Sequence, residues 1–150
     1  MEALRKQIGL KTIVNLRSEE ECKEDERCKE EAEFATREGV RLLLIPLHNP
    51  PMDDDLKAVV NVLDDERNYP VLVHCEHGKQ RAGVAVAVYR IERMGWTTGQ
   101  ALIEMLDVAE RGRLKFLNIH ENARFVAGYR PRFALTQETP VVAAPSTPPQ

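Results

Sequence analysis

The sequence predicts an α/β fold with a central, mainly parallel sheet and helices on both of its faces. Apolar runs without alternation occur at residues 11–16, 40–45 and 71–74, as expected of strands covered on both faces. Helix-length segments separate these runs, and such alternation is typical of parallel strands joined by right-handed crossovers. At 150 residues, with 43% hydrophobic and 30% charged residues, the chain is long enough for one domain with a single core.

After the first strand, a helix is predicted over residues 19–38. Ser18 and Glu21 form a capping box at its start, and Gly39 ends it. The first half of this helix is densely acidic. We interpret it as a solvated face, with a docking surface for a basic partner as the alternative. The strand at 40–45 then leads into a proline-containing loop, where a helix cannot continue.

The C-terminal half alternates in the same way. The helix after the third strand is apolar almost all round, so we expect it to be central and buried. A proline-rich stretch without any pattern closes the chain, and we expect it to be disordered. The domain therefore spans residues 1–133 and the tail residues 134–150. The predicted elements are a helix at 53–66, a strand at 71–74, a helix at 83–94, a helix capped by Thr97 and Gln100, and a helix at 114–129.

Composition disfavours several classes of partner. The net charge of −3 argues against nucleic acid and anionic membranes. No apolar stretch approaches the ~18 residues of a membrane span, and the first residues lack the apolar region of a signal peptide. We therefore expect a monomer in the cytoplasm.

Three cysteines, an odd number, indicate reduced thiols in a chain without an export signal. Cys22 and Cys28 lie six residues apart on the predicted helix and face different sides of it, so we expect no bridge between them and no chemical role. A metal site built on His74, Cys75 and His77 would lack a second pair of ligands at zinc spacing, so we expect none.

The most informative segment is residues 74–81, which connect the apolar runs 71–73 and 82–88. The chain thus passes from a strand through a short loop into a helix, whose first turn has unpaired N–H groups and a dipole that favours anions. Such surroundings lower the pKa of a cysteine thiol from about 8.5 to about 3.5–7.5 and make it a nucleophile. With Cys75 at the strand end and the planar guanidinium of Arg81 closing the loop, the segment predicts phosphoryl transfer through a cysteine.

His74-Cys75-x5-Arg81 after a strand resembles the signature of the cysteine-dependent protein tyrosine and dual-specificity phosphatases. Gly78-Lys79-x-Arg81 is similar to the plant and fungal atypical dual-specificity phosphatases. The resemblance covers roughly residues 8 to 110 and implies hydrolysis of phosphate monoesters of proteins, phosphoinositides or inositol phosphates, without metal or organic cofactor. Blocks that resemble small bacterial members lie at residues 11–17, 45–47, 70–73, 89–91 and 101–105.

The resemblance also implies roles for residues. Cys75 is the nucleophile that forms a phosphocysteine, Arg81 binds the phosphate oxygens, and His74 orients the loop and tunes the thiolate. Backbone N–H groups of the loop hold the equatorial oxygens, and Gly78 allows the turn that this requires. The substrate-binding positions are Glu76, His77, Gly78, Lys79, Gln80 and Ala82, with the side chains of Glu76 and Lys79 toward the rim.

Two features depart from the family pattern. In the larger dual-specificity enzymes the general acid lies further upstream of the cysteine than any aspartate of residues 53–55. The resemblance to the plant and fungal atypical group, whose loop is shorter, implies this role for Asp53, with Asp54 and His48 as alternatives; an Asp here can also simply cap a helix. Ala82 replaces the usual serine or threonine after the arginine, which predicts slower breakdown of the phosphocysteine. Relatives also carry an additional strand before residue 11, which we do not recognise here.

Two other functions fit parts of the pattern. A pseudophosphatase that binds phosphorylated ligands would explain Ala82 and the uncertain acid, although it would not need a reactive Cys75. A rhodanese-like sulfurtransferase also places a cysteine in an anion-binding loop, but its loop is typically shorter than the one between Cys75 and Arg81.

Overall fold

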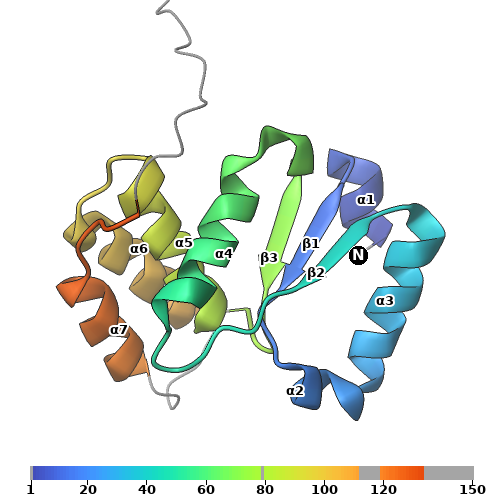
Figure 1. Cartoon of the computed structure of the whole chain (residues 1–150), viewed down its shortest axis with the longest axis horizontal. Coiled ribbons are helices and arrows are strands. Elements are labelled where there is room, and N and C mark those ends of the chain that lie inside the picture. Colours follow the sequence, from blue (N-terminus) through green and yellow to red (C-terminus); the bar gives the residue numbers. More distant parts are fainter. Residues whose placement is uncertain (1, 79, 112–118, 134–150) are drawn as a thin grey trace, which may run out of the picture.

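A three-stranded parallel sheet forms the centre of the fold (Figure 1). The computed structural model describes residues 2–78, 80–111 and 119–133, and within them the strand order is β2–β1–β3. The predicted alternation of strands and helices is thereby confirmed. In chain order the elements are α1 (Glu2–Ile8), β1 (Thr12–Asn15), α2 (Glu19–Lys23), α3 (Glu26–Glu38), β2 (Arg41–Leu44), α4 (Asp53–Asp64), the 3-10 helix η1 (Glu66–Asn68), β3 (Val71–His74), α5 (Arg81–Arg93), α6 (Thr98–Arg111) and α7 (Ile119–Gly128).

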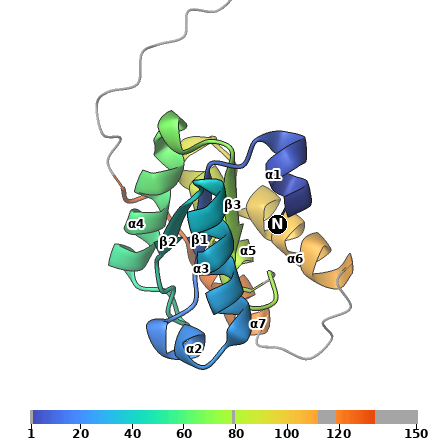
Figure 2. The same ribbon diagram turned by 90° about the vertical axis from the view of Figure 1, so that its right-hand side faces the viewer.

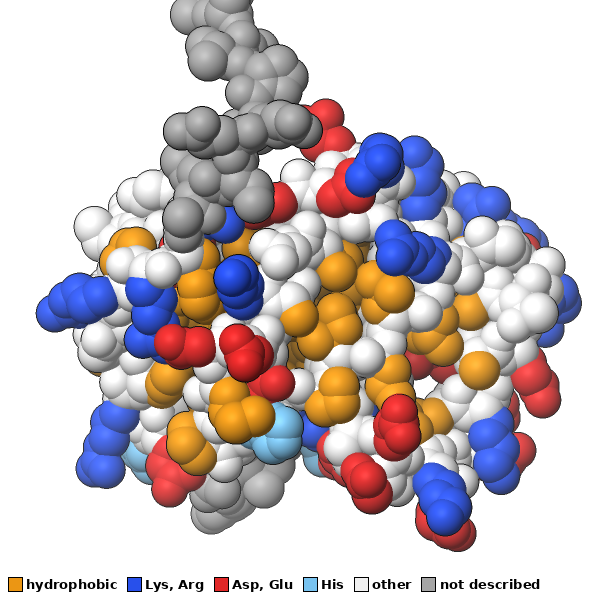
Figure 3. All heavy atoms as spheres, viewed as in Figure 1, with side chains coloured by type: hydrophobic (Ala, Val, Ile, Leu, Met, Phe, Trp, Pro, Cys, Tyr) orange, Lys and Arg blue, Asp and Glu red, His pale blue; other side chains and the backbone are white. Residues whose placement is uncertain are grey.

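The central strand β1 is buried along its whole length, whereas the two outer strands are only partly buried. The apolar runs predicted that all three strands would be covered on both faces. This prediction fits β1, whereas β2 and β3 are only partly covered. β2 lies at the edge of the sheet, and its Leu44 is 38% exposed. Figure 3 shows hydrophobic side chains over the middle of this face of the molecule, bordered by charged ones. In the register, Asn15 lies between Leu44 and His74, so the carboxyl ends of the three strands meet.

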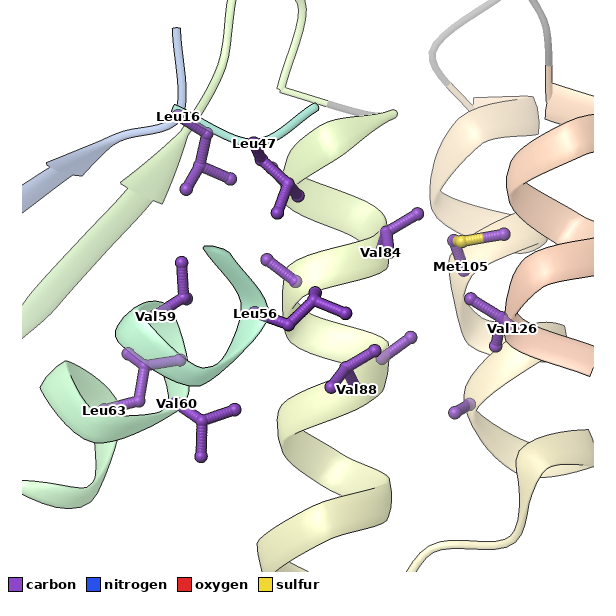
Figure 4. Packing of buried hydrophobic residues seen from close by; sticks show 14 of the residues in the cluster. Leu16, Leu47, Leu56, Val59, Val60, Leu63, Val84, Val88, Met105 and Val126 are labelled. Carbon is purple, nitrogen blue, oxygen red and sulfur yellow. The ribbon is translucent and has the colours of Figure 1, made fainter. Parts of the chain in front are cut away.

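Helices cover both faces of the sheet. On one face, Phe34 of α3 packs with Ile13 of β1 (Figure 2). On the other, Leu56 of α4 lies beside Val84 and Val88 of α5 (Figure 4), and α6 and α7 pack beyond α5. Ridges of apolar side chains at helical spacing produce these contacts. The prediction that α5 is central and buried is confirmed. Helix α4 buries Leu56, Val59, Val60 and Leu63.

The helix predicted over residues 19–38 is wrong in one respect, because the chain forms two helices there. Ser18 and Glu21 make the expected capping box for α2, and Gly39, at φ 64°, ends α3. The break follows from Asp25, whose side chain accepts a hydrogen bond from the backbone N–H of Arg27 and starts a new helix. Helix α1 was not predicted. Part of the helix expected at 114–129 and the whole tail 134–150 lie outside the described residues.

The same break brings Cys22 and Cys28 together in a disulfide, with their Cα atoms 5.3 Å apart. The expectation of reduced, unbridged thiols at these positions is therefore wrong. It assumed one continuous helix, on which residues six apart point in different directions, whereas the chain turns between α2 and α3. Cys75 is the free cysteine. None of the described helices is both long and apolar enough to cross a membrane.

Candidate active site

Cys75 lies at the carboxyl end of β3, directly before the loop that leads into α5. Its side chain is buried, with 6% of the residue exposed, and it belongs to the apolar core that α4 and α5 share. Gly78 has a φ of 68°, a left-handed conformation that glycine adopts without strain, and this lets the loop turn. Arg81 begins α5, so the loop ends on the positive end of a helix dipole.

His74, at the start of the loop, contacts the buried carboxylate of Glu31 on α3. Nδ1 of His74 donates to the carbonyl oxygen of Cys75 at 3.2 Å, and Nε2 lies 2.7 Å from Oε1 of Glu31. This second contact is an ion pair without hydrogen-bond geometry. Nδ2 of Asn15 donates to Oε2 of Glu31 at 2.8 Å. The carboxylate of Glu31 raises the pKa of His74 above its usual value, although burial of the ring and the nearby Arg17 act in the opposite direction.

Arg81, at the end of the loop, pairs with a second carboxylate, that of Glu21 on α2. The two terminal nitrogens of Arg81 donate to the two carboxylate oxygens of Glu21, at 2.6 and 2.7 Å, and one of them also donates to the carbonyl oxygen of Leu16 at 3.3 Å. The guanidinium lowers the pKa of Glu21 to about 2. The carboxylate in turn raises the pKa of Arg81, so the cation is permanent.

Arg17 binds the α2–α3 segment that carries both carboxylates. Its guanidinium donates to Sγ of Cys28 at 3.2 Å, to the carbonyl oxygen of Glu21 at 2.9 Å and to Oδ2 of Asp25 at 2.8 Å. It is 6% exposed, and its Nε has no hydrogen-bond partner among the residues that the structure describes. A pocket of about 160 Å³ lies beside this network, lined by Asn15, Arg17, Arg27, Cys28, Glu31, His74, Cys75 and Glu76.

The other loop positions differ in exposure. Glu76 is exposed and lies 3.8 Å from Arg27 in an ion pair, which agrees with its predicted place at the rim, and His77 is also exposed. Gln80 precedes α5 without capping it through its side chain. Ala82 is only 5% exposed and packs in the core. Lys79, predicted to bind substrate, lies outside the described residues.

The candidates for the general acid have other partners in the structure. Asp53, in the first turn of α4, pairs with Arg132 at 2.5 Å. Nδ1 of His48 lies 2.7 Å from Oδ2 of Asp55, and Asp54 is exposed. The described contacts therefore do not tie any of these residues to the loop of Cys75, and the choice among them stays a prediction.

Glu21, Glu31 and Arg17 were not predicted to take part in the site. The sequence predicted only a helix-capping role for Glu21. Glu31 carried a usable signal, because it lies three residues before Phe34 on the apolar face of its helix, where a carboxylate needs a buried partner. Its partner, His74, could not be identified without the fold. Among the described residues, no group of histidine, cysteine and carboxylate side chains is arranged to hold a metal ion.

The sequence is similar to those of known phosphatases. A protein-family model described as a DSP-PTPase phosphatase fused to NAD+ kinase matches residues 3–122. The dual specificity protein phosphatase TpbA of Pseudomonas aeruginosa is 44% identical over 68 residues, which are 44% of this chain and 31% of TpbA. The tyrosine-protein phosphatase-like protein OCA2 of Saccharomyces cerevisiae is 29% identical over 95 residues, 63% of this chain and 47% of OCA2. The chain thus spans less than half the length of these relatives.

Solved structures agree with the sequence comparisons. TpbA in complex with phosphotyrosine matches 84% of this chain and 71% of its own, with a TM-score of 0.63 and 30% identity. The catalytic domain of the PP-IP phosphatase SIW14 from S. cerevisiae matches 85% of this chain and 72% of its own, with a TM-score of 0.66; at 20% identity it supports the fold alone. With a matching family model over most of its length and a cysteine–arginine loop at the end of β3, the chain belongs to the DSP-PTPase family of cysteine-dependent phosphatases.

Proposed function

We propose that this chain hydrolyses phosphate monoesters through a phosphocysteine at Cys75. The observation that carries the proposal is a buried cysteine at the carboxyl end of β3, in a loop that Arg81 closes at the start of α5. The thiolate attacks phosphorus, so an S–P bond forms while the bond to the leaving oxygen breaks. Water then attacks the phosphocysteine, which releases phosphate and restores the thiolate.

The loop supplies the electrostatic part of catalysis. Backbone N–H groups from Glu76 to Ala82 and the dipole of α5 stabilise the charge on the transferred group. Arg81 adds a planar fork of donors, and phosphate oxygens have to share or replace the carboxylate of Glu21 that now occupies it. His77, Gly78, Lys79 and Gln80 form the rest of the binding loop.

The leaving oxygen needs a proton, which we assign to Asp53, with Asp54 and His48 as the alternatives. Asp53 would have to exchange its ion pair with Arg132 for a contact with the substrate. Both residues are well exposed, and an exposed ion pair contributes only about 0–1 kcal/mol, so this exchange is energetically small.

The substrate is a phosphoprotein, a phosphoinositide or an inositol phosphate. The relatives support the first and the last of these classes, since TpbA is known with bound phosphotyrosine and Arabidopsis thaliana DSP2, an inositol diphosphatase, is 41% identical over 39 residues, 26% of this chain and 15% of its own. A monomeric state is part of the proposal. A cytoplasmic location also stays a prediction, and the Cys22–Cys28 disulfide weighs against it because disulfides persist mainly in oxidising compartments.

The test is phosphate release from a small aryl phosphate by wild type and by Cys75→Ser. The serine variant keeps the shape of the loop but offers a poor nucleophile, so we expect it to fold and to lose turnover. Rapid acid quench of the wild type, followed by mass spectrometry, should find phosphate on the peptide that contains Cys75. Substantial turnover by the folded serine variant would refute the cysteine mechanism. Phosphate binding without turnover in the wild type would identify a pseudophosphatase instead.

A further inference from the structure

Glu31 is a buried carboxylate to which the reaction described above assigns no role. It is 5% exposed and lies on the side of α3 that faces the sheet. A carboxylate in such a place costs free energy unless charged or hydrogen-bonding groups compensate it. Its two oxygens are directed at the ends of two neighbouring strands, one at Asn15 of β1 and the other at His74 of β3.

The contacts of the imidazole ring of His74 indicate its protonation state. Nδ1 lies 3.2 Å from the carbonyl oxygen of Cys75, and Nε2 lies 2.7 Å from a carboxylate oxygen of Glu31. Nδ1 donates to the carbonyl oxygen, and the carboxylate beside Nε2 favours a positive charge on the ring through the ion pair, although that contact lacks hydrogen-bond geometry. The carboxylate lies at Nε2, while Nδ1 faces Cys75, so the ring stands between the anion and the start of the loop.

We propose that Glu31 is a positioning residue, which keeps His74 as an imidazolium with its ring fixed against the backbone of Cys75. A cation so placed favours the thiolate of Cys75, and the net effect is attractive because the compensating carboxylate is farther away. This inference rests on the proposed function in one respect, which is that Cys75 is the nucleophile.

Other charges around the pair are accounted for. Arg17, from the segment after β1, faces His74 and opposes its protonation, as does burial, yet the carboxylate of Glu31 raises the pKa of His74 above its usual value. Arg27 of α3 and Glu76 of the loop line the same pocket, and Arg81 interacts with Cys75 from the other end of the loop. Removal of Glu31 alone therefore leaves burial and Arg17, which favour the neutral form of His74, opposed by the contact of the ring with the carbonyl oxygen of Cys75.

The first test reads the ring of His74 directly by ¹H–¹⁵N NMR of the imidazole nitrogens in the wild-type protein. The His74 signals are assigned by their loss in His74→Gln. We expect both nitrogens to be protonated at pH 7.5, and a neutral ring at the same pH in Glu31→Gln. A neutral ring in the wild type at pH 7.5 would overturn the proposal, and this outcome does not depend on whether the variant folds.

The second test follows the rate at which iodoacetamide alkylates Cys75 as a function of pH. Cys22 and Cys28 do not compete, because they form a disulfide. In Glu31→Gln we expect the pH of half-maximal rate to rise by about 1 unit, the effect of losing one nearby cation. Glu33→Gln, an exposed position on the same helix, is the matched control and should not shift it.

The double variant Glu31→Gln with His74→Gln separates positioning from a merely structural role. Without the imidazole, loss of Glu31 should add no further shift of the alkylation midpoint relative to His74→Gln alone. An unchanged midpoint in folded Glu31→Gln, with a rate lowered equally at every pH, would overturn the proposal. Alkylation involves no phosphate, so a shifted midpoint in a protein without phosphatase activity would support this inference while refuting the proposed function.

Discussion

The loop around Cys75 is held at both ends by a carboxylate of the α2–α3 segment, but the two ends differ in exposure. At the Arg81 end, the side chains of Arg81 and Glu21 are 20% and 34% exposed. At the His74 end, the side chains of His74 and Glu31 are 25% and 6% exposed, so the two cations are similarly accessible and the difference lies in the carboxylates. The comparison teaches that the same chemistry serves two purposes: an anion from solution can replace the partly exposed carboxylate of Glu21 at Arg81, whereas the buried carboxylate of Glu31 holds His74 beside the backbone where the nucleophile is attached.

The two ends also respond to pH in opposite directions. The pKa of Glu21 is lowered from 4.5 to about 2, so its contribution to stability is present above about 4.5 and is lost as the pH falls toward 2. The pKa of His74 is raised above 6.5, so its contribution is present below 6.5 and is lost as the pH rises through the higher, folded-state value. Between about pH 4.5 and 6.5, both ion pairs contribute to the stability of the protein.

Arg81→Lys should have the largest effect at the exposed end. Lysine keeps the charge but cannot offer two parallel donors to the transferred phosphoryl group. We expect kcat/KM for an aryl phosphate to fall by about 10²–10³-fold, as when a preorganised donor to a developing negative charge is removed. Arg124→Lys, on the exposed side of α7, is the control. Wild-type efficiency in Arg81→Lys would mean that Arg81 acts as bulk charge only.

Ala82→Ser should have an intermediate effect, in the direction of gain. A hydroxyl beside the departing thiolate restores a donor for the second step, and one hydrogen bond to a charged group is worth about 1.5–3 kcal/mol. About 1.4 kcal/mol suffices for a tenfold rise in turnover. Rapid-quench kinetics should show a burst of about one leaving group per active site in the wild type, from one nucleophile per chain, and a smaller burst in the variant.

Ala85→Ser is the matched control, because Ala85 lies on the same helix and is just as buried. Its hydroxyl has no thiolate to bind, so it should destabilise the protein without raising turnover. If wild type shows no burst and Ala82→Ser is no faster, the first step limits turnover and Asp53 becomes the residue to test.

The smallest effect is expected from Glu21→Gln on stability. The ion pair is partly exposed, so its loss should lower the free energy of unfolding by no more than about 1 kcal/mol at pH 6. Urea unfolding at several pH values should show the difference between variant and wild type shrinking as the pH falls from 5 to 2, because wild-type Glu21 becomes protonated over that range. Glu19→Gln, exposed in the same helix turn, should not reproduce this pattern. A difference that stays constant with pH would show that Glu21 acts through its capping hydrogen bonds alone.

The fold and the nucleophile could be predicted from the sequence because they depend on local patterns. Apolar runs, the capping box at Ser18 and the loop from Cys75 to Arg81 are each contained in a few consecutive residues. The anchors could not be predicted in this way. Glu31 is 43 residues from His74 by number, and their meeting depends on how α3 packs across the sheet. The Cys22–Cys28 pair depends in turn on one side chain, Asp25, interrupting a helix.

That disulfide closes a short covalent ring across the α2–α3 junction. Glu21 is the neighbour of Cys22 in sequence, and Glu31 follows Cys28 by about one helical turn. Both carboxylates are thus attached to the same closed ring, so the spacing between them is constrained by covalent bonds as well as by packing. If an anion replaced Glu21 at Arg81 and α2 moved, the ring would pass that displacement on to α3. The carboxylates that hold the two ends of the loop therefore belong to one cross-linked unit rather than to two independent helices.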